Sequence, residues 1–223
     1  MTFYKLTKQI TPVLLILGFT GFFTGKTAYY VSGLSPFFYE LARMETNVFA
    51  KTRALRQVQM QDHDNQIRSR IEKIISNYHT GLDEKNSVRI PEWILVESKK
   101  YGYDPLFLTA LIITESSFYN WAKSNQGARG LMQLKPATAV ALASETSLKW
   151  KGIRTLFDPE KNIALGAYYL NKMVGRFGNL NLALEAYNHG PSRLRRYLRK
   201  GHQPKRYSRK VLKNYKKIRF QPI

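Results

Sequence analysis

The chain has 223 residues, which is enough for one domain with a full hydrophobic core and some extensions. It contains no cysteine, which excludes disulfides and a thiol nucleophile; its four histidines lack zinc-ligand spacing, and no Walker-type loop is present, so no metal or cofactor is predicted. Its 36 Lys and Arg against 15 Asp and Glu give a net charge of +21, which favours anionic partners.

Residues 1–31 have the pattern of a targeting segment. Lys5 and Lys8 precede an apolar run that extends from Ile10 to Phe23. The run has the size of a signal-peptide core and is short for a span of about 20 residues, but no clean small-x-small cleavage site follows it. We therefore favour an uncleaved signal anchor in the membrane over a cleaved signal peptide. Both alternatives predict export.

Residues 32–86 are predicted to form a helical linker region. Between Pro36 and Ile75 the apolar residues recur at spacings of three and four, but the polar stretch 57–65 interrupts them. This pattern favours one or two amphipathic helices, acting as a spacer packed on the main domain, over a sustained coiled coil. Residues 79–87 have loop composition, and we place the domain boundary at residue 86.

Residues 87–200 are predicted to form the main domain, with a first helix from Pro91 to about Lys100. Asp104 and Pro105 then start a second helix that is apolar on nearly all sides and is therefore expected to be buried. Glu115 comes near its C-terminal end, where desolvation and the helix dipole both raise the pKa of a carboxyl group. Glu115 is thus a candidate general acid, although by position alone a solvated surface glutamate is the commoner case.

Four sequence blocks from Val88 to about Leu198 together resemble the catalytic domain of the soluble lytic transglycosylase (SLT) family. In chain order they are Glu115-Ser116-x-Phe118, Gly127-Ala128-x-Gly130-Leu131-Met132-Gln133-Leu134-x-Pro136, Phe157-Asp158-Pro159-x-x-Asn162-Ile163-x-x-Gly166-x-x-Tyr169-Leu170 and Ala186-Tyr187-Asn188-x-Gly190. The resemblance covers about half of the chain. It implies an all-α, lysozyme-like (goose-type/SLT) fold, and the last block is predicted to follow a short helix over residues 180–186.

The resemblance also implies an activity, which is lytic cleavage of peptidoglycan glycan strands. The β-1,4 bond between N-acetylmuramic acid and N-acetylglucosamine would be broken with formation of 1,6-anhydro-N-acetylmuramic acid, and Glu115 would act first as acid and then as base. Together with the N-terminal segment, it implies a bacterial cell-envelope location, membrane-anchored, with the catalytic domain on the periplasmic or extracytoplasmic side. Spacing alone favours a core position for Tyr169, but the resemblance implies a substrate-binding set of Ser116, Met132, Gln133, Tyr169, Tyr187 and Asn188.

Two other functions stay open at this point. A hydrolytic muramidase would need a second carboxylate facing Glu115, and the candidates are Glu145, Asp158, Glu160 and Glu185. Asp158 is expected to cap a helix, while Glu185 stands where the family usually has a small residue; Lys135 and His189 also depart from the family. The alternative outside enzymes is a catalytically weak wall-binding or secretion-assembly module.

Residues 201–223 are predicted to be a basic C-terminal helix or tail. From Arg193 to Arg219 there are thirteen Lys or Arg and no acidic residue, with Tyr197, Tyr207 and Tyr215 interleaved. Such a segment could bind nucleic acid, but an exported chain rarely meets it, so no nucleic acid is expected. Anionic lipid or wall polymer is the nearer partner, and solvated faces of terminal helices are the simplest interpretation.

Overall fold

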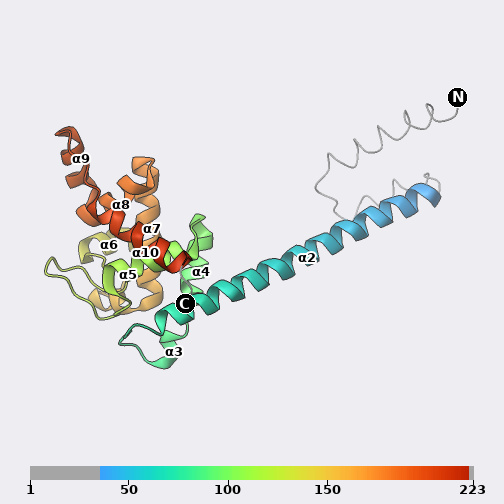
Figure 1. The fold of residues 1–223 in the computed structure, drawn as a ribbon, viewed down its shortest axis with the longest axis horizontal. Helices are drawn as coiled ribbons and strands as arrows, with labels where there is room; N and C mark the ends of the chain where they lie inside the picture. Colours follow the sequence, from blue (N-terminus) through green and yellow to red (C-terminus); the bar gives the residue numbers. More distant parts are fainter. Residues whose placement is uncertain (1–35, 221–223) are drawn as a thin grey trace. The chain divides into compact units, whose positions relative to one another are not determined.

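The computed structural model describes residues 36–220, and within this range the fold is all-α (Figure 1). Extended pairing there is limited to two isolated bridges, Lys123 with Arg129 and Arg129 with Leu134. The predicted signal anchor, residues 1–31, lies outside the described residues. In the part that is described, no helix is both long and apolar enough to cross a membrane.

The first described helix, α2, spans Pro36–Ile75 without interruption. The polar stretch 57–65 that suggested a break contains neither glycine nor proline, so nothing in it ends a helix. The chain divides into two compact units between Gln59 and Met60, and the C-terminal part of α2 belongs to the second unit. There Ile71, like Ile74 and Ile75, is buried in the hydrophobic core, so the region predicted as linker contributes to the main fold.

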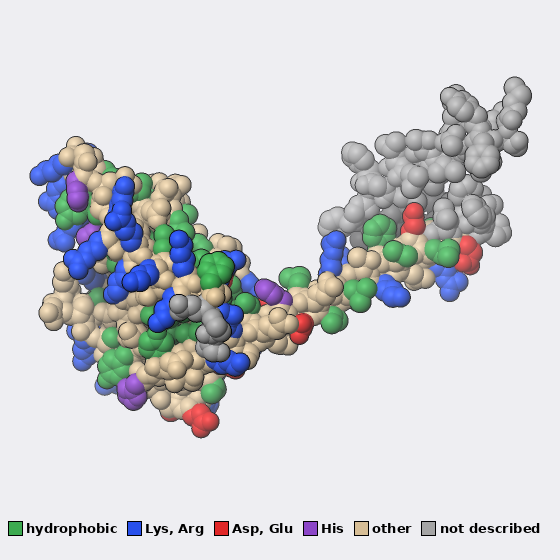
Figure 2. All heavy atoms as spheres, in the orientation of Figure 1, with side chains coloured by type: hydrophobic (Ala, Val, Ile, Leu, Met, Phe, Trp, Pro, Cys, Tyr) green, Lys and Arg blue, Asp and Glu red, His purple; other side chains and the backbone are tan. Residues whose placement is uncertain are grey.

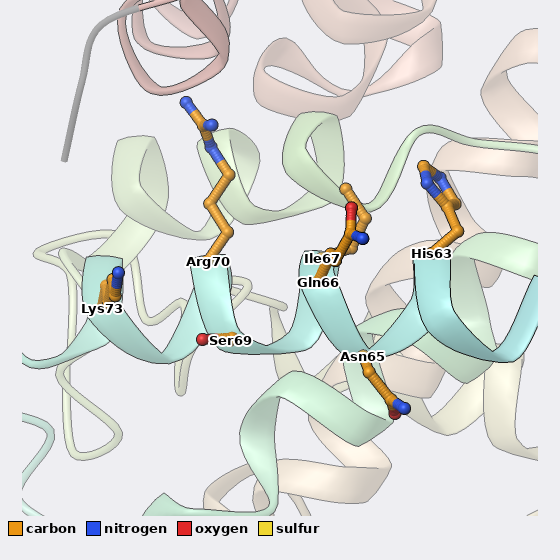
Figure 3. A pocket seen from close by; sticks show the side chains of 7 residues that line it. All are labelled: His63, Asn65, Gln66, Ile67, Ser69, Arg70 and Lys73. Carbon is orange, nitrogen blue, oxygen red and sulfur yellow. The ribbon is translucent and has the colours of Figure 1, made fainter.

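Arg70 of α2 binds the end of the last helix, α10, which spans Arg206–Phe220. Its guanidinium donates hydrogen bonds to the carbonyl oxygens of Ile218 at 2.8 Å and Arg219 at 3.1 Å. Figure 3 shows Arg70 pointing away from the α2 backbone, on the stretch of this helix that borders a pocket. The carbonyls at a helix end lack partners within the helix and carry the negative end of its dipole, so a cation is favourable there.

Helices α4, Ile90–Tyr101, and α5, Pro105–Ser116, come next along the chain and pack against each other. As predicted, Pro91 lies in the first turn of α4. Asp104 caps α5 by accepting a hydrogen bond from the backbone N–H of Leu106 at 2.8 Å. Most of α5 is buried, which confirms the prediction of a core helix that ends close to Glu115.

A long turn region leads from α5 to α6, Pro136–Glu145, which is followed by a 3-10 helix, η2, over Ile153–Phe157. The longest helix that follows is α7, Pro159–Phe177. The Asp158 carboxylate accepts a hydrogen bond from the backbone N–H of Lys161 at 3.2 Å, so the predicted capping role of Asp158 is confirmed.

Helix α8 spans Leu180–His189, three residues beyond the end predicted for it. The stop occurs at Gly190, with φ of 82°, and the next helix, α9, Pro191–Arg199, starts directly afterwards. No residue between 186 and 189 disfavours a helix, so α8 continues until Gly190. A glycine with positive φ, followed by proline, ends the helix there. The aromatic–amide pair of the fourth sequence block therefore lies inside the last helical turn and not after it.

Helix α10 packs on α5 and α8 and is part of the folded unit, not an appended tail (Figure 1). Its Val211 and Ile218 are buried in the main core. The core thus uses residues on both sides of the predicted range 87–200. All thirteen Lys and Arg from Arg193 to Arg219 are exposed, and Figure 2 shows basic side chains over the face that carries α9 and α10. These helices are amphipathic, with a solvated basic face.

Candidate active site

Glu115 lies in the last turn of α5 at the wall of a cleft of about 790 Å³. The side chain is partly buried. Of the residues predicted to bind substrate, the structure brings four to the same cleft, namely Gln133, Tyr169, Tyr187 and Asn188. Three separate regions of sequence therefore meet around one carboxyl group.

Burial raises the pKa of Glu115 from its ordinary value of 4.5 to about 7. Two groups act in the opposite direction: a hydrogen bond from Tyr207 and the positive charge of Lys210 both lower this pKa. The upward direction agrees with the sequence-based prediction, and burial is its cause. A carboxyl group with a pKa near neutrality can both give and take a proton at physiological pH.

Tyr207, at the start of α10, donates a hydrogen bond to Oε1 of Glu115, a contact that sequence reasoning missed. The basic residues around it suggested a role in anion binding. The signal that could have found it is the spacing of Tyr207, Val211, Asn214 and Ile218, which places them on one face of a helix. Val211 and Ile218 are buried on this face, and Asn214 is partly buried.

Tyr187 and Tyr169 form an aromatic wall of the cleft, with ring centroids 5.0 Å apart. The Tyr187 hydroxyl donates a hydrogen bond to the carbonyl oxygen of Met132 at 2.7 Å. Burial raises the pKa of Tyr169, and it raises that of Tyr187 well above its usual range, so both hydroxyls stay protonated. Tyr169 is partly buried and also borders the cleft. It therefore packs on the core, as its spacing suggested, and also lines the cleft. Asn188 is exposed at the cleft edge.

Gln133 borders the cleft, but its amide nitrogen is used by the turn that carries it. Nε2 donates to the carbonyl oxygens of Gly130 at 2.9 Å and Ala122 at 3.2 Å. The backbone of Gln133 is left-handed, with φ of 48°, and these bonds hold it there. The predicted sugar contact of Gln133 stays a prediction, and it would use the amide oxygen.

Ser116 and Met132 are absent from the described residues that line the cleft. The Ser116 hydroxyl donates to the carbonyl oxygen of Leu131 at 2.7 Å. Met132 is fully buried against Gly166, where an added Cβ would lie 2.4 Å from the methionine sulfur. Both side chains therefore stabilise the Gly130–Gln133 turn: Ser116 by its hydrogen bond to Leu131, and Met132 by its packing against Gly166.

Asn162 of α7 is fully buried and organises this turn. Its Oδ1 accepts from the backbone N–H of Met132 at 2.7 Å, and its Nδ2 donates to the carbonyl oxygens of Leu156 at 2.9 Å and Arg129 at 3.1 Å. Gly130 approaches so closely that a Cβ there would lie 2.2 Å from the Leu156 oxygen. The second and third sequence blocks are therefore joined by one amide side chain.

No second carboxylate accompanies Glu115 among the described residues that line the cleft. Glu145 is paired with Lys172 and accepts a hydrogen bond from Tyr168 at 2.9 Å, and Asp158 caps α7. Glu160 borders a different pocket. Glu185 is fully buried on α8 and accepts from the backbone N–H of Ser208 at 2.8 Å.

Two of the three departures from the family pattern, Lys135 and His189, border the cleft, as does Arg193. Lys135 Nζ donates to Oε1 of Gln126 at 3.1 Å. Lys135 and Arg193 place two positive charges at the cleft.

The comparison that decides the family is a match of residues 92–209, more than half of the chain, to the transglycosylase SLT domain. The chain belongs to the SLT family. It is 37% identical over 123 residues to a transglycosylase of Enterobacteria phage PRD1, covering 55% of this chain and 42% of the relative. It is 34% identical over 117 residues to a putative soluble lytic murein transglycosylase of Haemophilus influenzae, covering 50% and 20%.

Among solved structures, the 70 kDa soluble lytic transglycosylase of Escherichia coli is similar, with a TM-score of 0.53 and 27% identity. The match covers 58% of this chain and 24% of that one. The predicted all-α SLT fold is thereby confirmed. The chain spans less than half the length of each of these three relatives, so the similarity concerns the SLT domain.

Proposed function

We propose that this SLT-family chain is a peptidoglycan lytic transglycosylase in which Glu115 carries the chemistry. It would cleave the β-1,4 bond between N-acetylmuramic acid and N-acetylglucosamine and form 1,6-anhydro-N-acetylmuramic acid. The observation that carries the proposal is one carboxyl group, with a pKa of about 7, that borders an aromatic-walled cleft without a facing carboxylate among the described lining residues.

The hydrogen bond from Tyr207 to Oε1 supports different roles for the two oxygens of Glu115. With Oε1 occupied as an acceptor, Oε2 is the oxygen that holds the proton and passes it to the glycosidic oxygen. The bond from C1 of the muramic residue then breaks, and positive charge develops at that carbon. Tyr207 and Lys210 stabilise the carboxylate formed at this stage.

The same carboxylate would next take the proton of the C6 hydroxyl of the muramic residue, whose oxygen forms the new bond to C1. The proton returns to Glu115, and no water is consumed. An ordinary glycosidase needs a second carboxylate to attack C1 or to activate water. Here the substrate supplies its own nucleophile, which is consistent with a single acid in the cleft.

Location and further partners belong to the same proposal. Residues 1–31 would hold the protein in the membrane of a bacterial envelope, with the SLT domain on the extracytoplasmic side. The exposed basic face of α9 and α10 would bind anionic lipid or wall polymer. Its charge, +13 from Arg193 to Arg219, supports attraction to either surface.

The decisive experiment is digestion of purified peptidoglycan by the full chain, with mass spectrometry of the new glycan ends. We expect anhydro ends, lost in Glu115→Gln and retained in the control Glu72→Gln, which changes an exposed residue of α2. Reducing ends would show that water is the acceptor and favour a muramidase. A folded protein that binds peptidoglycan without cleaving it would favour the wall-binding or assembly module, and a fully active Glu115→Gln would refute the assignment of the acid.

A further inference from the structure

Glu185 is a fully buried acid that touches α10 and not the cleft. Its Oε1 accepts a hydrogen bond from the backbone N–H of Ser208 at 2.8 Å. Ser208 lies in the first turn of α10, where backbone N–H groups have no partner within the helix. A carboxylate is favourable at this position because it meets the positive end of the helix dipole.

The residue before Ser208 is Tyr207, the hydrogen-bond partner of Glu115. Glu185 on α8 and Glu115 on α5 are thus connected through two neighbouring residues of α10. Glu185 thus binds the first turn of α10, and Tyr207 of the same turn donates a hydrogen bond to Glu115.

We propose that Glu185 is a positioning residue, which holds the first turn of α10 so that the Tyr207 hydroxyl stays on Glu115. Glu185 touches neither substrate nor reacting atoms and acts through Tyr207. The proposal that this matters for cleavage rests on the proposed function. The positioning itself is a property of the resting protein and can be tested without turnover.

The other polar attachments of α10 to α5 lie further along the helix, so Glu185 acts locally. Asn214 donates to the hydroxyl of Thr114 at 2.9 Å, and Tyr215 donates to the carboxylate of Asp104 at 2.6 Å. The buried side chain of Ile218 packs near the C-terminal end. Removing the acceptor at residue 185 should therefore loosen the first turn and leave the rest of the helix in place.

The second oxygen of Glu185 connects this contact with the cleft. Oε2 accepts no hydrogen bond from a described residue, but Nε2 of His189 lies 3.4 Å away, close enough to form an ion pair when the imidazole is protonated. His189 itself borders the cleft. Tyr207 and Lys210 both lower the pKa of Glu115, and of these two groups Tyr207 is the one that Glu185 positions. The charge of Glu115 in turn raises the pKa of Tyr187.

The test is the pKa of Glu115, measured by NMR titration of the full chain labelled with ¹³C at glutamate carboxyl carbons, with Glu115→Gln to assign the signal. Tyr207→Phe removes a hydrogen bond to the ionised form and should raise this pKa by about one pH unit. Glu185→Met, which keeps the side-chain length but not the acceptor, should raise it in the same direction. Glu185→Gln retains an oxygen that can accept from Ser208, so it should stay near wild type.

In the double variant Tyr207→Phe with Glu185→Met, the pKa of Glu115 should equal that in Tyr207→Phe alone. Both changes act on the same contact, the hydrogen bond from Tyr207 to Glu115, so their effects should not add. A wild-type pKa in Glu185→Met, or a double variant that shows the sum of both shifts, would overturn the proposal. In the unsubstituted protein, the Ser208 amide should exchange with solvent more slowly than that of Arg206, and equal rates would count against it. The alkaline limb of the pH profile of cleavage should move with the pKa of Glu115, chiefly in kcat. If the wild type did not cleave peptidoglycan, the proposed function would be refuted. The NMR titration of Glu115 would still decide whether Glu185 is a positioning residue.

Discussion

Replacing Glu115 by Gln should make the folded protein more stable, and increasingly so as the pH rises from about 4.5 to 7. Burial raises the pKa of Glu115 to about 7 in the folded protein, whereas the unfolded chain has the ordinary value of 4.5. At about 1.4 kcal/mol for each pH unit between the two values, the ionised form costs the folded protein about 3 kcal/mol of stability. Glutamine is neutral throughout and avoids this cost.

The sign follows from the raised pKa. Below pH 4.5 the carboxyl group is protonated in both states, and its contribution to stability is fully present. Between 4.5 and 7 the unfolded chain ionises while the folded protein does not, so wild type loses stability relative to the variant. Above pH 7 both states are ionised and the difference stays constant.

The assay is thermal or urea unfolding of wild type and Glu115→Gln at matched pH values from 4 to 9. The control is Glu72→Gln, whose difference from wild type should not follow this curve, since residue 72 is exposed. A difference between wild type and Glu115→Gln that is flat, or that falls between pH 5 and 8, would show that the carboxyl group is not desolvated. That result would also remove the physical basis for its action as an acid.

Two further predictions concern the turn that faces Glu115. Asn162→Ala should lower the free energy of unfolding by about 3–5 kcal/mol, because it leaves one buried N–H and two carbonyl groups unpaired; a loss below about 1 kcal/mol in urea titration would contradict this reading. Gly130→Ala should lower the melting temperature far more than Gly178→Ala, since both glycines have positive φ but the added Cβ meets other atoms only at Gly130. A similar loss of melting temperature in both variants would mean that glycine is needed at residue 130 for its positive φ, and not for the close contact.

The parts of the fold that sequence predicted well are those fixed by local chemistry. Asp104 and Asp158 each precede a proline, and each caps the helix that was expected to follow. The apolar run before Glu115 forms a buried helix because nearly every side of it is hydrophobic. The helix predicted over residues 180–186 is also present, but it continues to His189, directly before Gly190.

The parts that sequence did not predict depend on contacts between distant residues. Tyr207 follows Glu115 by 92 residues, and its basic neighbours concealed the buried face of its helix. Ser116 and Met132 were assigned to substrate from resemblance, but their side chains brace the turn behind Gln133. Residue type and order indicated four residues that line the cleft, Gln133, Tyr169, Tyr187 and Asn188, whereas packing decided that Tyr207 contacts Glu115 and that Ser116 and Met132 do not line the cleft.

A site with a single acid must satisfy two opposite requirements with one group. Before bond cleavage Glu115 has to hold a proton, which burial favours, and afterwards it has to exist as a carboxylate, which Tyr207 and Lys210 favour. A pKa of about 7 is the balance of these effects, and neither alone would place it there. The helix that supplies both favourable contacts, α10, is held at its start by Glu185. The anchoring of this helix therefore matters for the chemistry of the site, although Glu185 itself does not line the cleft.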